Sequence, residues 1–271
     1  MERDLRASTV RNYVCAVRHY WRCRLPSDSP AVNAVLHRPR LLIREWRRTS
    51  GLVDLFAYPL PASWLHHALR HADPVVPALL VTAFLFFTRA SELTHASKTG
   101  TRFTVRDLSV SDSRVTIFLR LSKTDPGRGS SHERSALPGN LLCPVALLNA
   151  YLSSRRNNNP SDPAFQWRDG SPVTSGQLTD LVRSLATAAG ASTEFFSSHS
   201  LRSGGACAAA EANLGEAFLL REGRWASVLS LKHYLRLASA AGFFASAPML
   251  GSLFVPHIDT ARTRGPPQGR A

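Results

Sequence analysis

This chain of 271 residues has few cysteines, and none of them are closely spaced. Its four cysteines stand at positions 15, 23, 143 and 207, without a Cys-x-x-Cys pair. This usage fits a reduced intracellular protein better than a disulfide framework. Two groups of metal-binding residue types do occur at helical spacing, namely Cys15, His19 and Cys23, and His66, His67 and His71. We interpret both as ordinary helix faces, because the first lacks a fourth ligand and the second lacks the glutamate of a zinc-protease helix. The sequence therefore predicts neither a metal nor a cofactor.

The chain also lacks a long hydrophobic segment and an export signal. Its longest apolar run, residues 74–87, is shorter than the roughly 20 residues that span a bilayer. The first residues, MERDLRAST, are charged, and no apolar segment of a signal peptide follows them. The sequence therefore predicts a soluble protein with no membrane partner, in which residues 74–87 form a buried core helix.

Acidic residues are scarce relative to basic ones. The chain has 33 Lys and Arg against 19 Asp and Glu, which gives a formal net charge of +14. Such a charge favours a polyanionic partner, and nucleic acid is the first candidate. The alternative is a basic soluble protein from a genome whose composition raises the arginine content. With nucleic acid as partner, we expect the protein to lie with DNA, in the nucleus of a eukaryote or otherwise in the cytoplasm.

The residue pattern predicts a mainly helical protein with one small antiparallel sheet, an α+β class. Helical spacing and cap signals predict helices over residues 6–24, 30–37, 41–47, 61–72, 74–87, 144–154, 174–190, 199–212, 215–222 and 227–238. Alternating β-branched residues predict strands over residues 103–110, 114–121 and 133–137. Thr174 and Gln177 fit a capping box, and Gly190 fits the end of that helix. Pro, Gly and Arg dominate after residue 256, so we expect disorder at the C-terminal end.

One constellation of side chains suits attack on a phosphodiester without a metal. His199 and Arg202 open one predicted helix, Tyr234 lies in another, and Trp225 stands between them. Arg89 follows the apolar run far upstream. Guanidiniums bind non-bridging phosphate oxygens bidentately and offset the charge that develops on them. A phenol can supply the nucleophile, and a histidine can move protons.

In these residues the chain resembles the tyrosine recombinase (phage integrase) family. The family pattern is an arginine after a helix, a lysine on a hairpin, His-x-x-Arg, His or Trp, and then Tyr. The corresponding residues here occur in that order and are Arg89, Lys123, His199, Arg202, Trp225 and Tyr234. Arg89 also stands in an R-x-x-E-L context, which makes Glu92 its expected buttress. The HSLRSGG and GRW-x-S segments look closest to recombinases carried by eukaryotic mobile elements.

The resemblance implies a domain organisation. Residues 1–50 look like a partial helical core-binding domain, residues 51–58 a linker, residues 59–247 the catalytic domain and residues 248–271 a C-terminal tail. A full core-binding domain has about four helices, and only the last two or three look present here. Within the region 238–254, a segment rich in phenylalanine is a candidate for packing between protomers, or alternatively for packing on the protein's own core.

The resemblance also implies a reaction and partners. Tyr234 would attack double-stranded DNA and form a 3′-phosphotyrosyl link, without metal or ATP, in a homotetramer on two duplexes. Lys123 would protonate the leaving 5′-oxygen, and His199 would shuttle a proton or contact the phosphate. Plainer interpretations remain for single residues: core packing for Trp225 and Tyr234, and a solvated turn for Lys123. The alternative functions are a topoisomerase-like enzyme that relaxes one duplex and an inactive DNA-binding relic of a mobile element.

Overall fold

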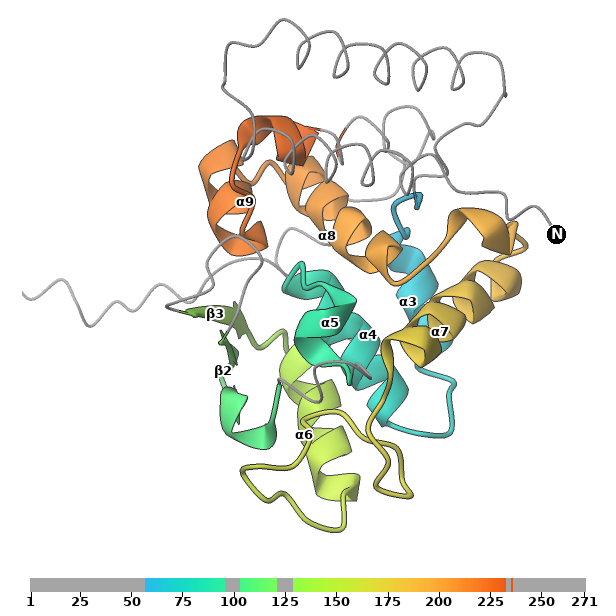
Figure 1. Cartoon of the computed structure of the whole chain (residues 1–271), viewed down its shortest axis with the longest axis vertical. Helices are drawn as coiled ribbons and strands as arrows, with labels where there is room; N and C mark the ends of the chain where they lie inside the picture. The colour runs from blue at the N-terminus through green and yellow to red at the C-terminus, as the bar shows by residue number, and fades with distance from the viewer. Residues whose placement is uncertain (1–56, 96–102, 121–128, 233–234, 236–271) are drawn as a thin grey trace, which may run out of the picture. The chain divides into compact units, whose positions relative to one another are not determined.

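The computed structural model describes residues 57–95, 103–120, 129–232 and 235, all within the compact unit that begins at Ala57 (Figure 1). The helices expected before residue 50, the core-binding domain and the tail over 248–271 lie outside the described residues. So do most of the linker at 51–58, Lys123 and Tyr234. The domain boundaries therefore stay predictions.

The centre of the core is α4, Val75–Leu85. Every residue of this helix is buried, which is why its sequence is apolar on all sides rather than on one stripe. The helix contacts both α6, Pro144–Ser154, and α8, His199–Glu211. The prediction of a buried core helix over residues 74–87 is confirmed. No helix within the described residues is long and apolar enough to cross a membrane.

The helix expected over residues 61–72 is shorter than predicted. The 3-10 turn η1, Ala62–Trp64, leads into α3, Leu65–Ala68, and the chain then leaves the helical path. Asp73 accepts a hydrogen bond from the Val75 N–H at 3.1 Å and so caps α4. The residues before Asp73 must turn to bring this carboxylate over the start of α4, and the earlier helix ends there.

The sheet has three antiparallel strands in the order β1-β2-β3: β1 is Leu108–Val110, β2 is Arg114–Leu119 and β3 is Ser130–Ser135. The first strand starts later than residue 103, because Thr104 and Asp107 form a capping box around the 3-10 turn η2, Val105–Asp107. The Thr104 N–H donates to Asp107 Oδ2 at 3.0 Å. The third strand starts earlier than residue 133, since Ser130 pairs with Leu119 at the far end of β2.

Further helices form where the sequence predicts them. The capping box of Thr174 and Gln177 starts α7, Ser175–Ala188, and Gly190 follows with a positive φ of 73°. The 3-10 turn η3, Thr193–Phe195, joins α7 to α8, and α9 spans Glu216–Gly223. Residues 228–232 are also helical, within the helix expected over 227–238. The predicted class, mainly helical with a small antiparallel sheet, is confirmed.

Two adjacent glycines let α8 approach its neighbours closely. A β-carbon at Gly204 would overlap the Leu60 backbone, and one at Gly205 would overlap the Phe84 carbonyl oxygen of α4. The Leu60 N–H donates to the Ser200 carbonyl at 2.9 Å in the first turn of α8. These contacts fix the N-terminal turn of α8, which carries His199 and Arg202, against the end of α4.

Candidate active site

The first part of the site is the turn between α4 and α5, Ala90–Leu93. Phe87 adopts a left-handed conformation with φ of 49°, which turns the chain after α4. Arg89 is the N-cap residue of α5, and its backbone N–H donates to Glu92 Oε2 at 2.8 Å. The Arg89 guanidinium binds the other carboxylate oxygen, Oε1, also at 2.8 Å. The Arg89 side chain is 23% exposed and that of Glu92 only 5%, so the arginine is reachable from outside while the carboxylate behind it is buried.

Arg202 comes to the same place from the first turn of α8, and it is 1% exposed. Its Nη1 donates to the Phe87 carbonyl and its Nη2 to the Gly223 carbonyl, so the guanidinium joins the end of α4 to the end of α9. The guanidinium also lies over the Trp225 ring, 4.4 Å from the ring centroid. Both bonds run from the charged guanidinium to backbone carbonyls, and they hold it in place between the two elements.

His199 lies beside both arginines at the start of α8. Although much of its surface is exposed, its ring is set deep enough for desolvation to lower its pKa, and the charges of Arg202 and Arg89 lower it further. An imidazole whose pKa lies below its usual value of 6.5 is neutral at pH 7 and keeps one nitrogen as a proton acceptor.

Trp225 is the next predicted site residue, and it is 8% exposed. Its ring lies 6.2 Å from that of Phe87, between centroids, and beneath Arg202. The ring also covers Gly223, where a β-carbon would overlap it. Core packing is therefore one role of this indole, and a hydrogen bond from its N–H to a phosphate oxygen stays a prediction.

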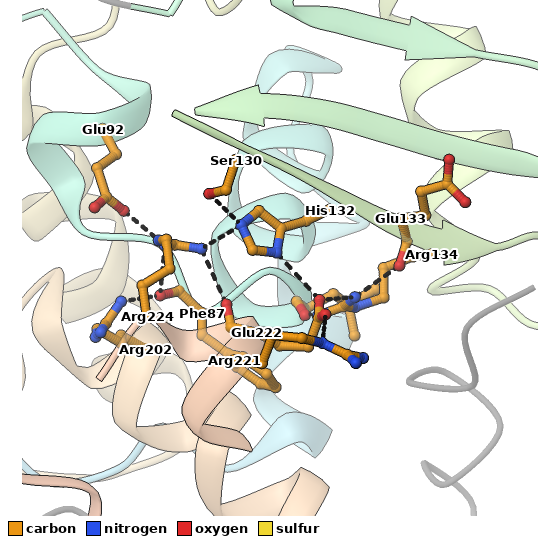
Figure 2. A network of polar contacts seen from close by, with 11 residues as sticks. Phe87, Glu92, Ser130, His132, Glu133, Arg134, Arg202, Arg221, Glu222 and Arg224 are labelled. Atoms are coloured by element: carbon orange, nitrogen blue, oxygen red, sulfur yellow. Dashed lines mark hydrogen bonds and ion pairs between the residues drawn. The ribbon is translucent and has the colours of Figure 1, made fainter. Parts of the chain in front are cut away.

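A third arginine, Arg224, completes the cluster, and the sequence reasoning missed it (Figure 2). It follows α9 in a left-handed conformation with φ of 55°. Its Nη2 donates to Glu92 Oε2 at 2.8 Å and to the Phe87 carbonyl at 3.3 Å. Burial would raise the pKa of Glu92, but the charges of Arg224, Arg89 and Arg202, with the hydrogen bond from the Arg89 backbone, lower it. Glu92 is therefore ionised, and three guanidiniums surround it with an excess of positive charge.

The network continues from Arg224 to the sheet and to α9, as Figure 2 shows. Arg224 Nη1 lies 3.3 Å from Nε2 of the buried His132 on β3. The other ring nitrogen, Nδ1, lies 3.2 Å from Glu222 Oε2, which also accepts from Arg134 Nη1 at 2.9 Å. Desolvation lowers the pKa of His132, although its bond to Glu222 raises it in part. A neutral ring fits this network: Nδ1–H donates to Glu222, and Nε2 accepts from Arg224.

Glu222 is the second carboxylate of this network. Burial opposes its ionisation, but the hydrogen bond from His132 and the charge of Arg134 outweigh burial and lower its pKa to about 2. A sequence signal for this part existed, since His132 and Arg134 alternate on β3 and so face the same side of the sheet. Polar residues on an inward strand face indicate a buried polar network.

The structure thus brings Arg89, Glu92, His199, Arg202 and Trp225 together. Lys123 and Tyr234 lie outside the described residues, so their positions stay predictions. Across the described ranges no group of three or more His, Cys, Asp or Glu residues is arranged to hold a metal ion.

The chain matches no protein-family model and no curated protein sequence. Among solved structures, XerA recombinase matches 86% of this chain and 78% of its own, with 15% identity and a TM-score of 0.50. XerH site-specific recombinase bound to a difH substrate matches with 18% identity and a TM-score of 0.47. This match covers 69% of the present chain, which spans about half (53%) of the XerH chain.

The Tn1549 transposon integrase, in complex with a circular intermediate DNA, matches 88% of this chain and 85% of its own. The identity is 14% and the TM-score 0.47. The XerA match, with a TM-score of 0.50, shows a shared fold, and its identity of 15% does not show a shared reaction. The fold of this chain is that of the tyrosine recombinases.

Proposed function

We propose that the protein is a site-specific DNA recombinase or integrase that cleaves and rejoins strands through a 3′-phosphotyrosyl intermediate on Tyr234. The observation that carries this proposal is the convergence of Arg89, Arg202 and Arg224 on the Glu92 carboxylate and the Phe87 carbonyl. A cluster of guanidiniums that exceeds its carboxylate in charge favours an anion, and Arg89 is reachable from outside.

Duplex DNA is the anion that the wider molecule favours. The net charge of +14 favours a polyanion. The XerH and Tn1549 integrase structures, to which this chain is similar, contain a DNA substrate and a circular intermediate DNA. The start of α8 adds the partial positive charge of a helix N-terminus beside His199. A backbone phosphate at this position would meet both the arginines and the end of this helix.

In the proposed reaction Arg89 binds a non-bridging oxygen of the scissile phosphate, and the buried charge of Arg202 adds to the stabilisation. His199, neutral at pH 7, accepts the phenol proton as the Tyr234 oxygen bonds to phosphorus. The bond from phosphorus to the 5′-oxygen breaks, and Lys123 gives that oxygen its proton. A 5′-hydroxyl of a second strand then reverses the step, so that neither a metal nor ATP is consumed. We place four protomers on two duplexes for this exchange.

The test uses a pool of nicked duplexes with randomised sequence, from which the protein selects its own site. Cleavage next to the nick releases a short DNA fragment. Because this fragment diffuses away, the strand cannot be rejoined, and the protein stays covalently bound to DNA as an adduct that resists detergent. Wild type should give an adduct with an enriched sequence, and Tyr234→Phe should give none. Tyr58→Phe removes a phenol oxygen from a ring that stacks on Phe195, at 5.0 Å between centroids, and should retain the adduct.

The alternatives are separated with the enriched site. Joined products between two duplexes support a recombinase, whereas relaxation of a supercoiled plasmid without joining indicates a topoisomerase-like enzyme. Binding to the pool without any adduct from wild type would overturn the catalytic proposal and leave a DNA-binding relic.

A further inference from the structure

Arg224 connects the elements that carry the two predicted phosphate-binding arginines. Through Nη2 it holds Glu92, the carboxylate that also binds Arg89. Through the same nitrogen it shares the Phe87 carbonyl with Arg202 Nη1. The positions of both other guanidiniums therefore depend on acceptors that Arg224 contacts.

The Arg224 guanidinium is itself fixed from the opposite side. Its Nη1 donates to the Glu222 carbonyl at 3.0 Å and lies 3.3 Å from His132 Nε2. His132 in turn lies 2.8 Å from Ser130 Oγ on the same strand, β3. The Arg224 side chain is 6% exposed, so these contacts are made away from bulk solvent. There a planar cation with several donors holds its partners in a fixed orientation.

We propose that Arg224 is a positioning residue, which holds Arg89 and Arg202 in the relative arrangement that binds the scissile phosphate. The inference rests on the proposed function and extends it to a residue outside the predicted set of site residues. A guanidinium is required, because a lysine ammonium carries its three donors on one nitrogen. It cannot hold Glu92 and Phe87 from one nitrogen and His132 and Glu222 from another. Without these contacts the Arg89 and Arg202 guanidiniums would shift relative to the scissile phosphate. Even a small shift slows a reaction that depends on the exact placement of the reacting groups.

The decisive variant is Arg224→Lys, which keeps the charge. Its control is Arg221→Lys, three residues earlier, at an exposed arginine that pairs with Glu222 Oε1 at 3.1 Å. Each variant would first be shown to unfold cooperatively on heating. Cleavage rates would then be compared on the enriched nicked site, with either a normal phosphate or an uncharged methylphosphonate at the scissile position.

We expect Arg224→Lys to slow cleavage of the phosphate substrate roughly 10- to 100-fold. The loss should be several-fold smaller on the methylphosphonate, where less charge needs to be matched. Arg221→Lys should resemble wild type on both substrates. Equal losses on the two substrates would indicate general damage and would overturn the inference, as would wild-type rates in Arg224→Lys.

A second measurement keeps the inference testable without cleavage. Titration of the full chain with inorganic phosphate should show weaker binding to Arg224→Lys than to Arg221→Lys or wild type. If wild type makes no adduct, the proposed function fails, and this titration alone decides the role of Arg224. Equal phosphate affinity in all three proteins would then overturn it.

Discussion

The Arg224 guanidinium lies 2.8 Å from the Glu92 carboxylate, although 132 positions separate the two residues in the chain. Both side chains are almost fully buried, at 6% and 5% exposure. This ion pair joins the end of α9 to the start of α5, and it forms the centre of the candidate site.

Replacing Glu92 by glutamine should strongly destabilise the fold. The neutral amide leaves Arg224 and Arg89 without the carboxylate that both contact, and breaking a buried pair from one side costs about 3 kcal/mol or more. Chemical denaturation would measure this loss. The control Glu133→Gln removes a carboxylate that is 40% exposed and 3.5 Å from Arg114, and it should cost less than about 1 kcal/mol. Similar losses in the two variants would contradict the assignment of Glu92 as a buried anchor.

Acid should weaken the fold through Glu222. Its folded pKa of about 2 lies below the usual 4.5, so its contribution to stability is complete above pH 4.5 and is lost as pH falls toward 2. This pKa difference corresponds to about 3 kcal/mol in the free energy of unfolding. Denaturation of wild type and Glu222→Gln across this range would show it. The variant should lose less stability between pH 4.5 and 2, and parallel curves would contradict the prediction.

The rate of adduct formation should depend on the ionisation of His199. Desolvation of its ring and the charges of Arg202 and Arg89 lower its pKa below 6.5, so the neutral base persists at pH 7 and is lost only at lower pH. The wild-type rate should therefore fall as pH drops through a value below 6.5. In His199→Gln this acidic decline should disappear, with the rate at pH 7 reduced roughly 100-fold. An unchanged profile in the variant would show that another group controls the rate.

Gly205 tests the close packing that places α8. A methyl group there would overlap the Phe84 carbonyl oxygen, so Gly205→Ala should destabilise by about 1–3 kcal/mol and weaken the site together with the fold. Gly176, in the first turn of α7, has Thr174 Oγ1 as its near neighbour at 3.9 Å. Gly176→Ala should therefore be neutral or slightly stabilising. Thermal unfolding of both variants measures the contrast, and equal effects would mean that α8 can shift without loss.

Local signals in the sequence predict much of this fold. The capping box of Thr174 and Gln177 starts α7 where expected, and the apolar run gives α4. Where prediction failed, a competing local bond decided the outcome. Thr104 and Asp107 bond to each other and convert the start of an expected strand into a turn. The register of β3 depends on its pairing with β2, which the alternation in its own sequence does not reveal.

In the candidate site, too, local spacing predicts some residues and tertiary contacts decide others. The three-residue spacing of His199 and Arg202 placed both in the first turn of α8, and the spacing of Arg89 and Glu92 gave their contact. Arg224 could not be found by spacing, because its role arises from acceptors on three distant elements. It also follows α9 like an ordinary cap residue, so that only tertiary contacts distinguish it.

The shared carbonyl of Phe87 has a consequence for how a ligand would meet this protein. Two cations donate to one oxygen that a left-handed backbone turns toward them, so their mutual repulsion is already overcome when the chain folds. A phosphate group that binds here meets two guanidiniums already held close together by the fold. Its negative charge reduces the repulsion between them, and no free energy of binding is needed to bring them together. Anion binding and native stability are therefore thermodynamically linked at this turn, each strengthening the other.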